Sequence, residues 1–296
     1  MTSINKILIT GAAGLVGRAV CRLLHMQKQP FVALYKTEPG NTPEWDYVYG
    51  DIANCDLQKI LSTHNISSVV HCAAAIPNEK NSFFECYQIN SAIDKHIAEY
   101  IVAAAITQLI YISTTNLYGM SGEIITESSP VNIENDYSQA KFESEQMFSS
   151  INSTSVVSLR INAPYHYTQL NNTVLKIFIN NVLSGKDILY HGKGNRQQDF
   201  THVNDIAAAV LCALKEKKAG IYNIAAGNPV SMKNLATLIL LKVTGSKSKI
   251  MPSGLPDVQE NHTAVFNINK AKEELHWKPV IQLDAGIEEW IKYLQQ

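Results

Sequence analysis

The chain has 296 residues, of which 46% are hydrophobic and 17% are charged, and its formal net charge is −1. This length accommodates one large domain or two modest ones with a sizeable core. The balanced charge gives no electrostatic reason to expect a nucleic acid or a membrane as a partner. The first strand begins almost at once, and the most apolar helical stretch (97–105) contains Glu99 and is too short to span a bilayer. We therefore expect a soluble cytoplasmic protein.

The five cysteines stand singly along the chain, without a CxxC pair, and most of them fall inside apolar runs. This distribution favours buried thiols in a reducing compartment over disulfides or zinc ligands. The nine histidines show no metal-ligand spacing, so we expect no metal site.

Short apolar strands alternate with helical patterns over the first half of the chain. The first strand, residues 6–10, is followed by a glycine-punctuated turn and then by a helical pattern that runs to Leu24. Further strands are predicted at 30–34, 47–49, 68–71, 109–113 and 156–161, and further helices at 57–61, 83–105 and 136–148. This alternation predicts an α/β fold with a doubly wound, parallel Rossmann-type sheet covered on both faces by helices.

The second half has a looser rhythm. It contains predicted strands at 188–190 and 221–224 and predicted helices at 173–183, 203–214, 232–243, 269–275 and 283–294. We interpret it as a smaller α/β substrate domain interleaved with the first domain, with a cleft at the carboxyl ends of the strands. The predicted dinucleotide-binding domain is 1–162 with approximately 200–226, and the predicted substrate domain is 163–199 with 227–296.

The turn after the first strand carries three glycines in a GxxGxxG spacing, one residue longer than the common dinucleotide fingerprint. Gly11 permits the tight turn, Gly14 lets the backbone approach a pyrophosphate, and Gly17 lets the helix pack closely on the strand. The N-terminus of the following helix offers free N–H groups and a partial positive charge to phosphates. The pattern predicts a dinucleotide site, and the alternative is a turn that serves only packing.

Tyr137 and Lys141 lie four residues apart on a predicted polar helix and therefore share one face. A neighbouring ammonium favours the phenolate, which would bring the pKa of a tyrosine closer to neutrality and suit it to proton transfer. Hydroxyl residues, among them Thr114, end the strand before this helix and can hydrogen-bond a substrate oxygen. The alternative for Tyr137 and Lys141 is a surface pair that arose by chance. The alternative for the hydroxyl residues is that they are ordinary strand residues and a turn cap.

With these motifs in place, nearly the whole chain resembles the extended short-chain dehydrogenase/reductase family, in its NAD-dependent epimerase/dehydratase group. The segments that carry the resemblance are 10–17 (TGAAGLVG), 50–52 (GDI), 70–74 (VHCAA), Asn90, 113–119 (STTNLYG), 137–141 (YSQAK), 198–205 (QDFTHVND), 220–224 (GIYNI) and 270–279 (KAKEELHWKP).

The resemblance implies hydride transfer between a sugar-like carbinol or ketone and a nicotinamide. Tyr137 would be the acid/base, Lys141 its pKa partner and ribose ligand, and Thr114 the hydroxyl that orients the reacting oxygen. Asp51 would accept from the adenine amino group, and Asn90 would lie near the catalytic lysine or be a structural amide. Implied cofactor contacts are Gly11, Ala13, Gly14, Leu15, Val16, Gly17, Tyr35, Lys36, Asp51, Ile52, Ala73, Ala74, Asn90, Tyr137, Lys141 and Pro164, and implied substrate contacts are Thr115, Asn116, His166 and Arg196.

The chain departs from the family pattern at the end of its second strand, where NAD-preferring members carry an acidic residue. Tyr35 and Lys36 stand there instead, and Lys36 could attract a 2′-phosphate, so our hypothesis is that NADP(H) is accepted, whether or not it is preferred over NAD. The alternative for Lys36 is a solvated loop charge. Family dehydratases carry an Asp-Glu pair where this chain has Thr115 and Asn116. Neither residue supplies a carboxylate, and 4,6-dehydration is not expected.

The substrate end departs as well. Ala163 stands where many nucleotide-sugar enzymes have asparagine, Gln198 where they often have arginine, and His166 where glycine is usual. Arg196, two residues before Gln198, would still reach a pyrophosphate, because a guanidinium forks onto phosphate oxygens. A surface loop arginine is the alternative.

We therefore predict an NAD(P)-dependent 4-ketoreductase or 4-epimerase of a nucleoside-diphosphate sugar. The absence of the acidic NAD-gripping residue favours cofactor exchange and hence reduction. A reductase of a small lipophilic carbonyl compound, or a non-catalytic NAD(P)-sensing protein on the same fold, are the alternatives. The resemblance also implies a homodimer formed by the two long helices, 83–105 and 136–148.

Overall fold

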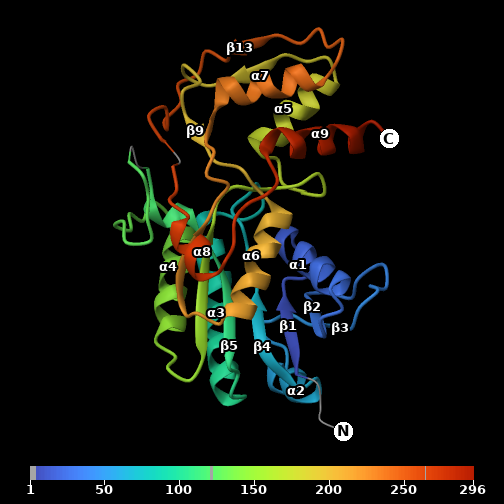
Figure 1. The fold of residues 1–296 in the computed structure, drawn as a ribbon, viewed down its shortest axis with the longest axis vertical. Coiled ribbons are helices and arrows are strands. Elements are labelled where there is room, and N and C mark those ends of the chain that lie inside the picture. The colour runs from blue at the N-terminus through green and yellow to red at the C-terminus, as the bar shows by residue number, and fades with distance from the viewer. Residues whose placement is uncertain (1–4, 121–122, 264) are drawn as a thin grey trace.

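The computed structural model describes residues 5–120, 123–263 and 265–296. A seven-stranded sheet runs through it in the order β11-β6-β5-β4-β1-β2-β3, and every neighbouring pair is parallel. The strand order turns at β1, which has β2 and β3 on one side and β4, β5, β6 and β11 on the other (Figure 1). The strands are β1 (Lys6–Thr10), β2 (Phe31–Tyr35), β3 (Tyr47–Tyr49), β4 (Ile66–His71), β5 (Gln108–Thr114), β6 (Ser155–Ile161) and β11 (Gly220–Ile224).

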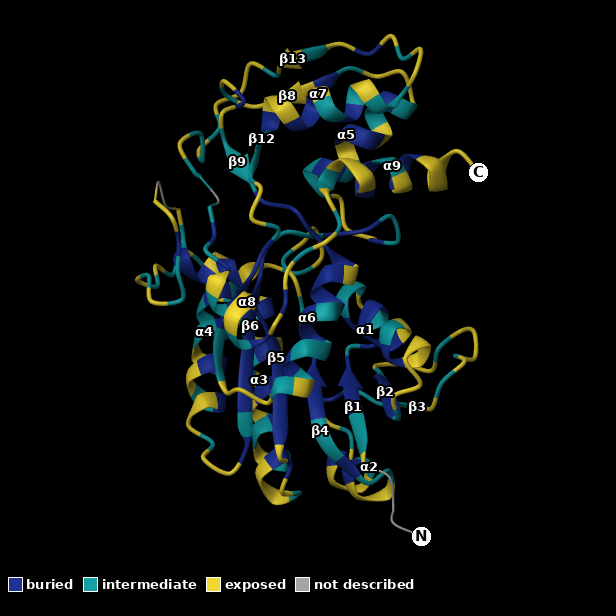
Figure 2. Cartoon of the chain, viewed as in Figure 1, coloured by how far each residue is buried: buried dark blue, intermediate teal, exposed yellow. Residues whose placement is uncertain are grey.

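Helices cover both faces of this sheet because its strands place apolar side chains on both faces. Leu8 of β1 belongs to one hydrophobic cluster and the next residue, Ile9, to the other, since successive side chains of a strand point to opposite sides. One face is covered by α1 (Leu15–Met26), α6 (Val203–Glu216) and α8 (Asn269–Glu274), and the other by α2 (Leu57–Thr63), α3 (Phe83–Ala103) and α4 (Asp136–Ser149). Figure 2 shows the strands buried between these layers, and the predicted doubly wound fold class is confirmed.

A second group of elements lies beyond the sheet, at the top of Figure 1. It shares a third hydrophobic cluster and contains three short strand pairs. The predicted division of the chain into a dinucleotide-binding and a substrate domain agrees with this cluster but stays a prediction. The helices of the group are α5 (Val174–Leu183), α7 (Met232–Lys242) and α9 (Leu283–Leu294), and its strands are β7 (Pro164–Tyr165), β8 (Ile188–Tyr190), β9 (Gln197–Gln198), β10 (Thr201–His202), β12 (Val230–Ser231) and β13 (Ile250–Pro252).

The predicted elements differ from the structure mainly at their ends. Helix α3 stops at Ala103 rather than at 105, because Ala104 caps it and Ala105 has a left-handed φ of 51° that cannot continue a helix. Strand β5 runs one residue further than predicted, to Thr114, and a 3₁₀ turn, η1 (Thr115–Tyr118), follows it. Among the described residues, no helix has the length and apolar character needed to cross a membrane.

Candidate active site

The site begins where β1 and β4 lie side by side and end together. Thr10 and His71 are register partners at this edge, so the turn that starts at Gly11 faces the chain that leaves β4. A Cβ on Gly11 would lie 2.6 Å from Ala73 N, and the φ of Gly11 is +65°. A Cβ on Gly17 would collide with Gly11 O. Glycine is therefore required at both positions by close backbone packing.

The first turn of α1 has the properties of a phosphate-binding helix end. Gly14 occupies the N-cap position and supplies no side-chain cap, and the first turn contains no acidic residue. Ala13 and Gly14 are exposed, and Leu15 and Val16 begin the helix. Uncapped N–H groups at the positive end of a twelve-residue helix suit an anion. The turn therefore fits the diphosphate of a dinucleotide.

The predicted adenosine contacts gather at the ends of β2 and β3. Lys36 Nζ lies 3.0 Å from Asp51 Oδ2, and this hydrogen bond, opposed by burial, lowers the pKa of the Asp51 carboxyl. The ring of Tyr35 packs edge-on against that of Tyr47, and Ile52 is buried. The sequence identified Lys36 and Asp51 separately, and the structure brings them together as an ion pair.

The loop after β4 carries Ala73 and Ala74, and it is held from both sides. Ala73 N–H donates to Thr10 Oγ1 over 3.3 Å. The side-chain amide of Asn90 accepts from Ala75 N–H and donates to Ala75 O, at 2.7 and 3.0 Å. Asn90 thus uses its amide on the loop backbone, so any contribution it makes to cofactor binding acts through the position of that loop.

The predicted catalytic residues come from α4 and from the end of β5. Asn135 caps α4 by accepting from Ser138 N–H, which starts the helix just before the half-buried Tyr137. Lys141, one turn later, is 3% exposed, and its Nζ donates to Ile112 O over 3.0 Å. Thr114 is buried at the strand end, where its Oγ1 accepts from Asn116 N–H. Asn116 itself is exposed.

The electrostatics of Tyr137 differ from the expectation. Burial raises the pKa of the Tyr137 phenol, and Cys86 and Asp94 raise it further. The Lys141 ammonium donates to Ile112 O and lies 4.6 Å from the centroid of the Tyr111 ring, so its contacts are with β5. With its pKa raised, the Tyr137 phenol is protonated at neutral pH, which is the form that can donate a proton.

Two predicted substrate residues are tied into the protein. Thr115 is buried and donates its hydroxyl to Asn162 Oδ1 over 2.9 Å. Arg196 Nε lies 3.1 Å from Asp257 Oδ2, and its Nη1 donates to Gln259 Oε1. Both side chains therefore position the chain around them. A role in substrate binding stays a prediction for each, and for Arg196 it requires a phosphate to compete with Asp257.

His166 and Pro164 lie where the sheet passes into the second group of elements. Pro164 pairs with Thr201 in the β7–β10 ladder. His166 is buried, and burial together with the charges of Arg22 and Arg18 lowers its pKa to about 4. Arg18 and Arg22 belong to α1, the helix that follows the glycine turn 11–14, which we call the phosphate turn after its predicted role.

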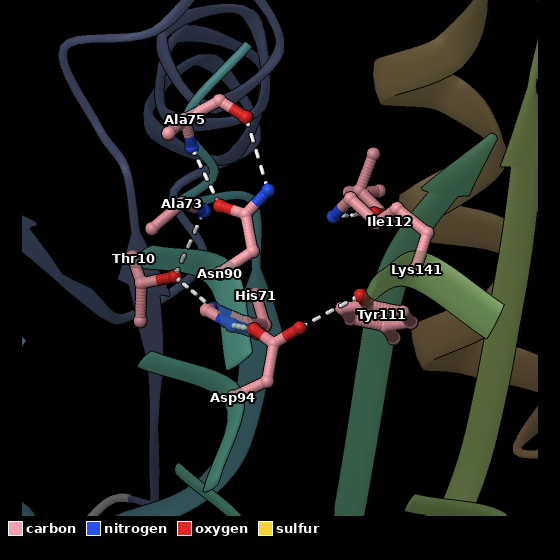
Figure 3. A network of polar contacts seen from close by, with 9 residues as sticks. All are labelled: Thr10, His71, Ala73, Ala75, Asn90, Asp94, Tyr111, Ile112 and Lys141. Carbon is pink, nitrogen blue, oxygen red and sulfur yellow. Dashed lines mark hydrogen bonds and ion pairs between the residues drawn. The ribbon is translucent and has the colours of Figure 1, made fainter. Parts of the chain in front are cut away.

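A buried polar network beneath the site was not predicted (Figure 3). It joins Thr10 to His71, His71 to Asp94, and Asp94 to Tyr111, with hydrogen bonds of 2.6, 2.7 and 2.9 Å. A signal for it exists in the sequence: Asp94 follows Asn90 by four residues and precedes Ile97 by three, which places a carboxylate on the apolar stripe of α3. Within the described residues no cluster of metal-ligand type occurs.

Comparisons with known proteins agree with this geometry. The sequence profile of the NAD dependent epimerase/dehydratase family matches residues 7–225. The chain is 27% identical to a dTDP-4-dehydro-6-deoxyglucose reductase of Escherichia coli over 98% of both chains, and 27% identical to a putative UDP-glucose 4-epimerase of Methanocaldococcus jannaschii over 98% of both.

Solved structures share the fold across the whole chain. A UDP-glucose 4-epimerase of Thermotoga maritima, crystallised with UDP-glucose, superposes with a TM-score of 0.86 at 21% identity and covers 98% of both chains. One of Thermus thermophilus, in complex with NAD, gives 0.87 at 20% identity and covers 98% of this chain and 99% of its own. As its motifs predicted, the chain belongs to the NAD-dependent epimerase/dehydratase family of enzymes.

Proposed function

We propose that this chain is an NAD(P)-dependent 4-ketoreductase of a nucleoside-diphosphate sugar, with Tyr137 as the proton donor. The observation that carries the proposal is the arrangement of Tyr137 and Lys141 one turn apart on α4, which packs against the end of β5. The Tyr137 phenol is protonated at neutral pH and so has a proton to give, and reduction of a carbonyl requires a proton donor.

The residues have distinct tasks in this reaction. The nicotinamide supplies hydride when it is bound. The Thr114 hydroxyl accepts from Asn116 N–H, which leaves its own hydrogen to donate to the substrate oxygen. Tyr137 gives its phenolic proton to the same oxygen as that oxygen becomes an alkoxide, and the Lys141 ammonium holds a ribose hydroxyl of the cofactor.

The residue that follows β2 favours reduction over epimerisation. Lys36 there has a 74% exposed side chain, whose ammonium could bind the 2′-phosphate of NADP(H) in competition with Asp51. Use of NADP(H) fits a reductase, which exchanges its cofactor in each turnover. The E. coli relative is a 4-keto-sugar reductase by name. A 4-epimerase is the second candidate, because the M. jannaschii relative and the two superposed structures carry that name.

Loss of water from the sugar is not part of the proposal. Thr115 and Asn116 stand where dehydratases have two carboxylates, and the Thr115 hydroxyl is already donated to Asn162. Neither side chain takes up or releases a proton near neutral pH, so the chain lacks the second acid/base pair that 4,6-dehydration requires.

Product analysis tests the proposal. The purified chain is given a dTDP-linked 4-keto-6-deoxy sugar with NADPH or NADH, and separately UDP-glucose with NAD. We expect one equivalent of reduced nicotinamide to be consumed for each 4-hydroxy sugar formed. Conversion of UDP-glucose to its 4-epimer without net cofactor consumption would identify the 4-epimerase instead. Turnover of small lipophilic ketones alone, or cofactor binding without any turnover, would contradict the proposal.

We also propose that the chain forms a homodimer through α3 and α4. These two helices pack on each other beside the sheet, and α3 presents exposed apolar side chains, Phe83, Phe84 and Ile89, near its start. Exposed apolar groups of this kind favour association with a second copy. Light scattering should give twice the chain mass for the wild type and a lower mass for Phe84→Glu, and a monomeric wild type would contradict the proposal.

A further inference from the structure

Asp94 is a carboxylate in the interior of the protein, 1% exposed, between α3 and the sheet. Its Oδ1 accepts from His71 Nε2 at 2.7 Å and its Oδ2 accepts from Tyr111 OH at 2.9 Å. Thr10 Oγ1 lies 2.6 Å from His71 Nδ1 and also accepts from Ala73 N–H. Burial acts to raise the pKa of Asp94, but the hydrogen bond and charge of His71 and the charge of Lys141 outweigh it, so the pKa is lowered and the carboxylate is ionised at neutral pH.

Figure 3 shows Asp94 at the hydroxyl end of Tyr111 and the Lys141 side chain above the Tyr111 ring. Its Nζ is 4.6 Å from the centroid of the Tyr111 ring, the same ring whose hydroxyl donates to Asp94. The other carboxylate that acts on Lys141 is Glu145, and it is bound through both oxygens by Arg160 at 2.6 to 3.3 Å. Because Glu145 is paired directly with Arg160, it acts on Lys141 less than Asp94 does.

We propose that Asp94 is a positioning residue whose carboxylate is the counter-charge that keeps the Lys141 ammonium protonated in its buried seat. The proposal rests on the proposed function, in which that ammonium holds the cofactor ribose. Tyr111 links the two charges: its ring lies under the ammonium and its hydroxyl is fixed by the carboxylate.

The groups that face Lys141 support this role. Burial lowers the pKa of Lys141, and Asp94 from α3, Cys72 after β4 and Glu145 from α4 oppose that effect, Asp94 first. A buried ammonium without a counter-charge loses its proton near neutral pH. Tyr111 from β5 and Tyr137 from α4 are neutral phenols at neutral pH, since burial raises the pKa of each, so they add no competing charge.

Asp94→Asn tests the proposal with almost no change of shape. The amide oxygen can still accept from His71, and the amide nitrogen can donate to Tyr111 once that hydroxyl rotates. The dissociation constant of NADPH is measured by its fluorescence between pH 7 and pH 9. We expect a nearly constant value for the wild type and a rise of about tenfold with pH for D94N, because loss of the counter-charge lowers the pKa of its Lys141 further. Placing D94N on a Lys141→Met background should remove the pH-dependent difference.

Two further variants separate charge from structure. Tyr111→Phe deletes the hydrogen bond to Asp94 but keeps both the carboxylate and the ring, so its pH profile should follow the wild type even if it melts earlier. If D94N fails to fold, Asp94→Ser replaces it, since the smaller side chain leaves room for water between His71 and Tyr111. The pH dependence of its NADPH dissociation constant is then compared with that of the wild type.

Each outcome bears on one proposal only. A D94N profile as flat as the wild type, or a rise that persists without Lys141, would overturn the role of Asp94. A wild type that binds neither NADPH nor NADH would instead overturn the proposed function. Binding without turnover leaves the Asp94 comparison intact, because the readout is affinity rather than activity.

Discussion

At the scale of single residues, the proposed reduction depends on whether Tyr137 can give up a proton. Its phenol is protonated at neutral pH, since burial raises its pKa and Asp94 adds to the effect. We predict that Tyr137→Phe lowers kcat by roughly 10²- to 10⁴-fold, the range that general acid catalysis contributes, while the dissociation constant of the cofactor stays the same. Stopped-flow turnover and fluorescence titration measure the two quantities.

A matched tyrosine gives the control for this prediction. Tyr87 on α3 donates its hydroxyl to Glu143 at the surface, so Tyr87→Phe should leave kcat unchanged. A Y137F enzyme that retains turnover within twofold of the wild type would remove Tyr137 from the mechanism.

Asp199 is a second residue with an unusual environment, and it links stability to pH. It is fully buried, and burial raises its pKa to about 6, although backbone N–H groups such as that of Gly227 oppose the shift. The folded pKa therefore exceeds the unfolded value of about 3.9. The folded state therefore binds the Asp199 proton more tightly than the unfolded state does. The protonated carboxyl contributes its full stabilisation of the fold below the unfolded pKa, and this contribution is lost as pH rises through 6.

Asp199→Asn should remove this pH dependence. Its oxygen still accepts from Gly227, but it has no proton to lose. We predict that the stability of the wild type relative to D199N falls by about 2 kcal/mol between pH 4 and pH 7.5. Urea denaturation at several pH values measures the difference. A difference that is independent of pH would show that Asp199 is ionised throughout.

At the scale of elements, the turn between β1 and α1 has to be built from glycine. A Cβ on Gly17 has no free space, because it would meet Gly11 O in the same turn. We predict that Gly17→Ala costs about 1–3 kcal/mol of stability, as overpacking does, and abolishes cofactor binding because the turn must open. Thermal melting and cofactor fluorescence measure the two effects.

Gly40 supplies the comparison, since a Cβ there meets nothing within 4 Å and its φ is not in the left-handed region. Gly40→Ala should therefore leave both stability and affinity within error of the wild type. If G17A bound cofactor as tightly as G40A does, the turn would not be the phosphate site.

The elements that the sequence predicted well are those with a local pattern. Strands β1 to β6 each carry a run of apolar residues, and α4 carries an asparagine cap, so their positions follow from neighbours along the chain. The two-residue strands β7, β9, β10 and β12 have no such period and exist only because of their pairing partners. Long-range polar pairs were missed for the same reason: Lys36 meets Asp51, and Arg196 meets Asp257, only after the chain has folded.

At the scale of the whole molecule, the strand order brings the parts of the site together. Because β1 lies between β2 and β4, the phosphate turn, the Ala73 loop and the end of β2 meet at one edge of the sheet. Strand β5 brings Thr114 to that edge, and α4 packs beside it. A dinucleotide bound there would contact segments from four strands, so its binding energy should stabilise the fold as a unit.

This coupling makes melting temperature a measure of cofactor choice. A ligand at one hundred times its dissociation constant adds about 2.7 kcal/mol of stability, which for a chain of this size raises the melting temperature by roughly 4 °C. We predict a larger rise with NADPH than with NADH at equal concentration, because the exposed Lys36 ammonium attracts the 2′-phosphate.

Lys36→Gln should remove the difference between the two cofactors. Lys59 is an exposed lysine on α2, so Lys59→Gln should preserve the difference. A larger rise with NADH in the wild type would assign the chain to NAD and, by removing the argument for cofactor exchange, would favour the 4-epimerase over the reductase.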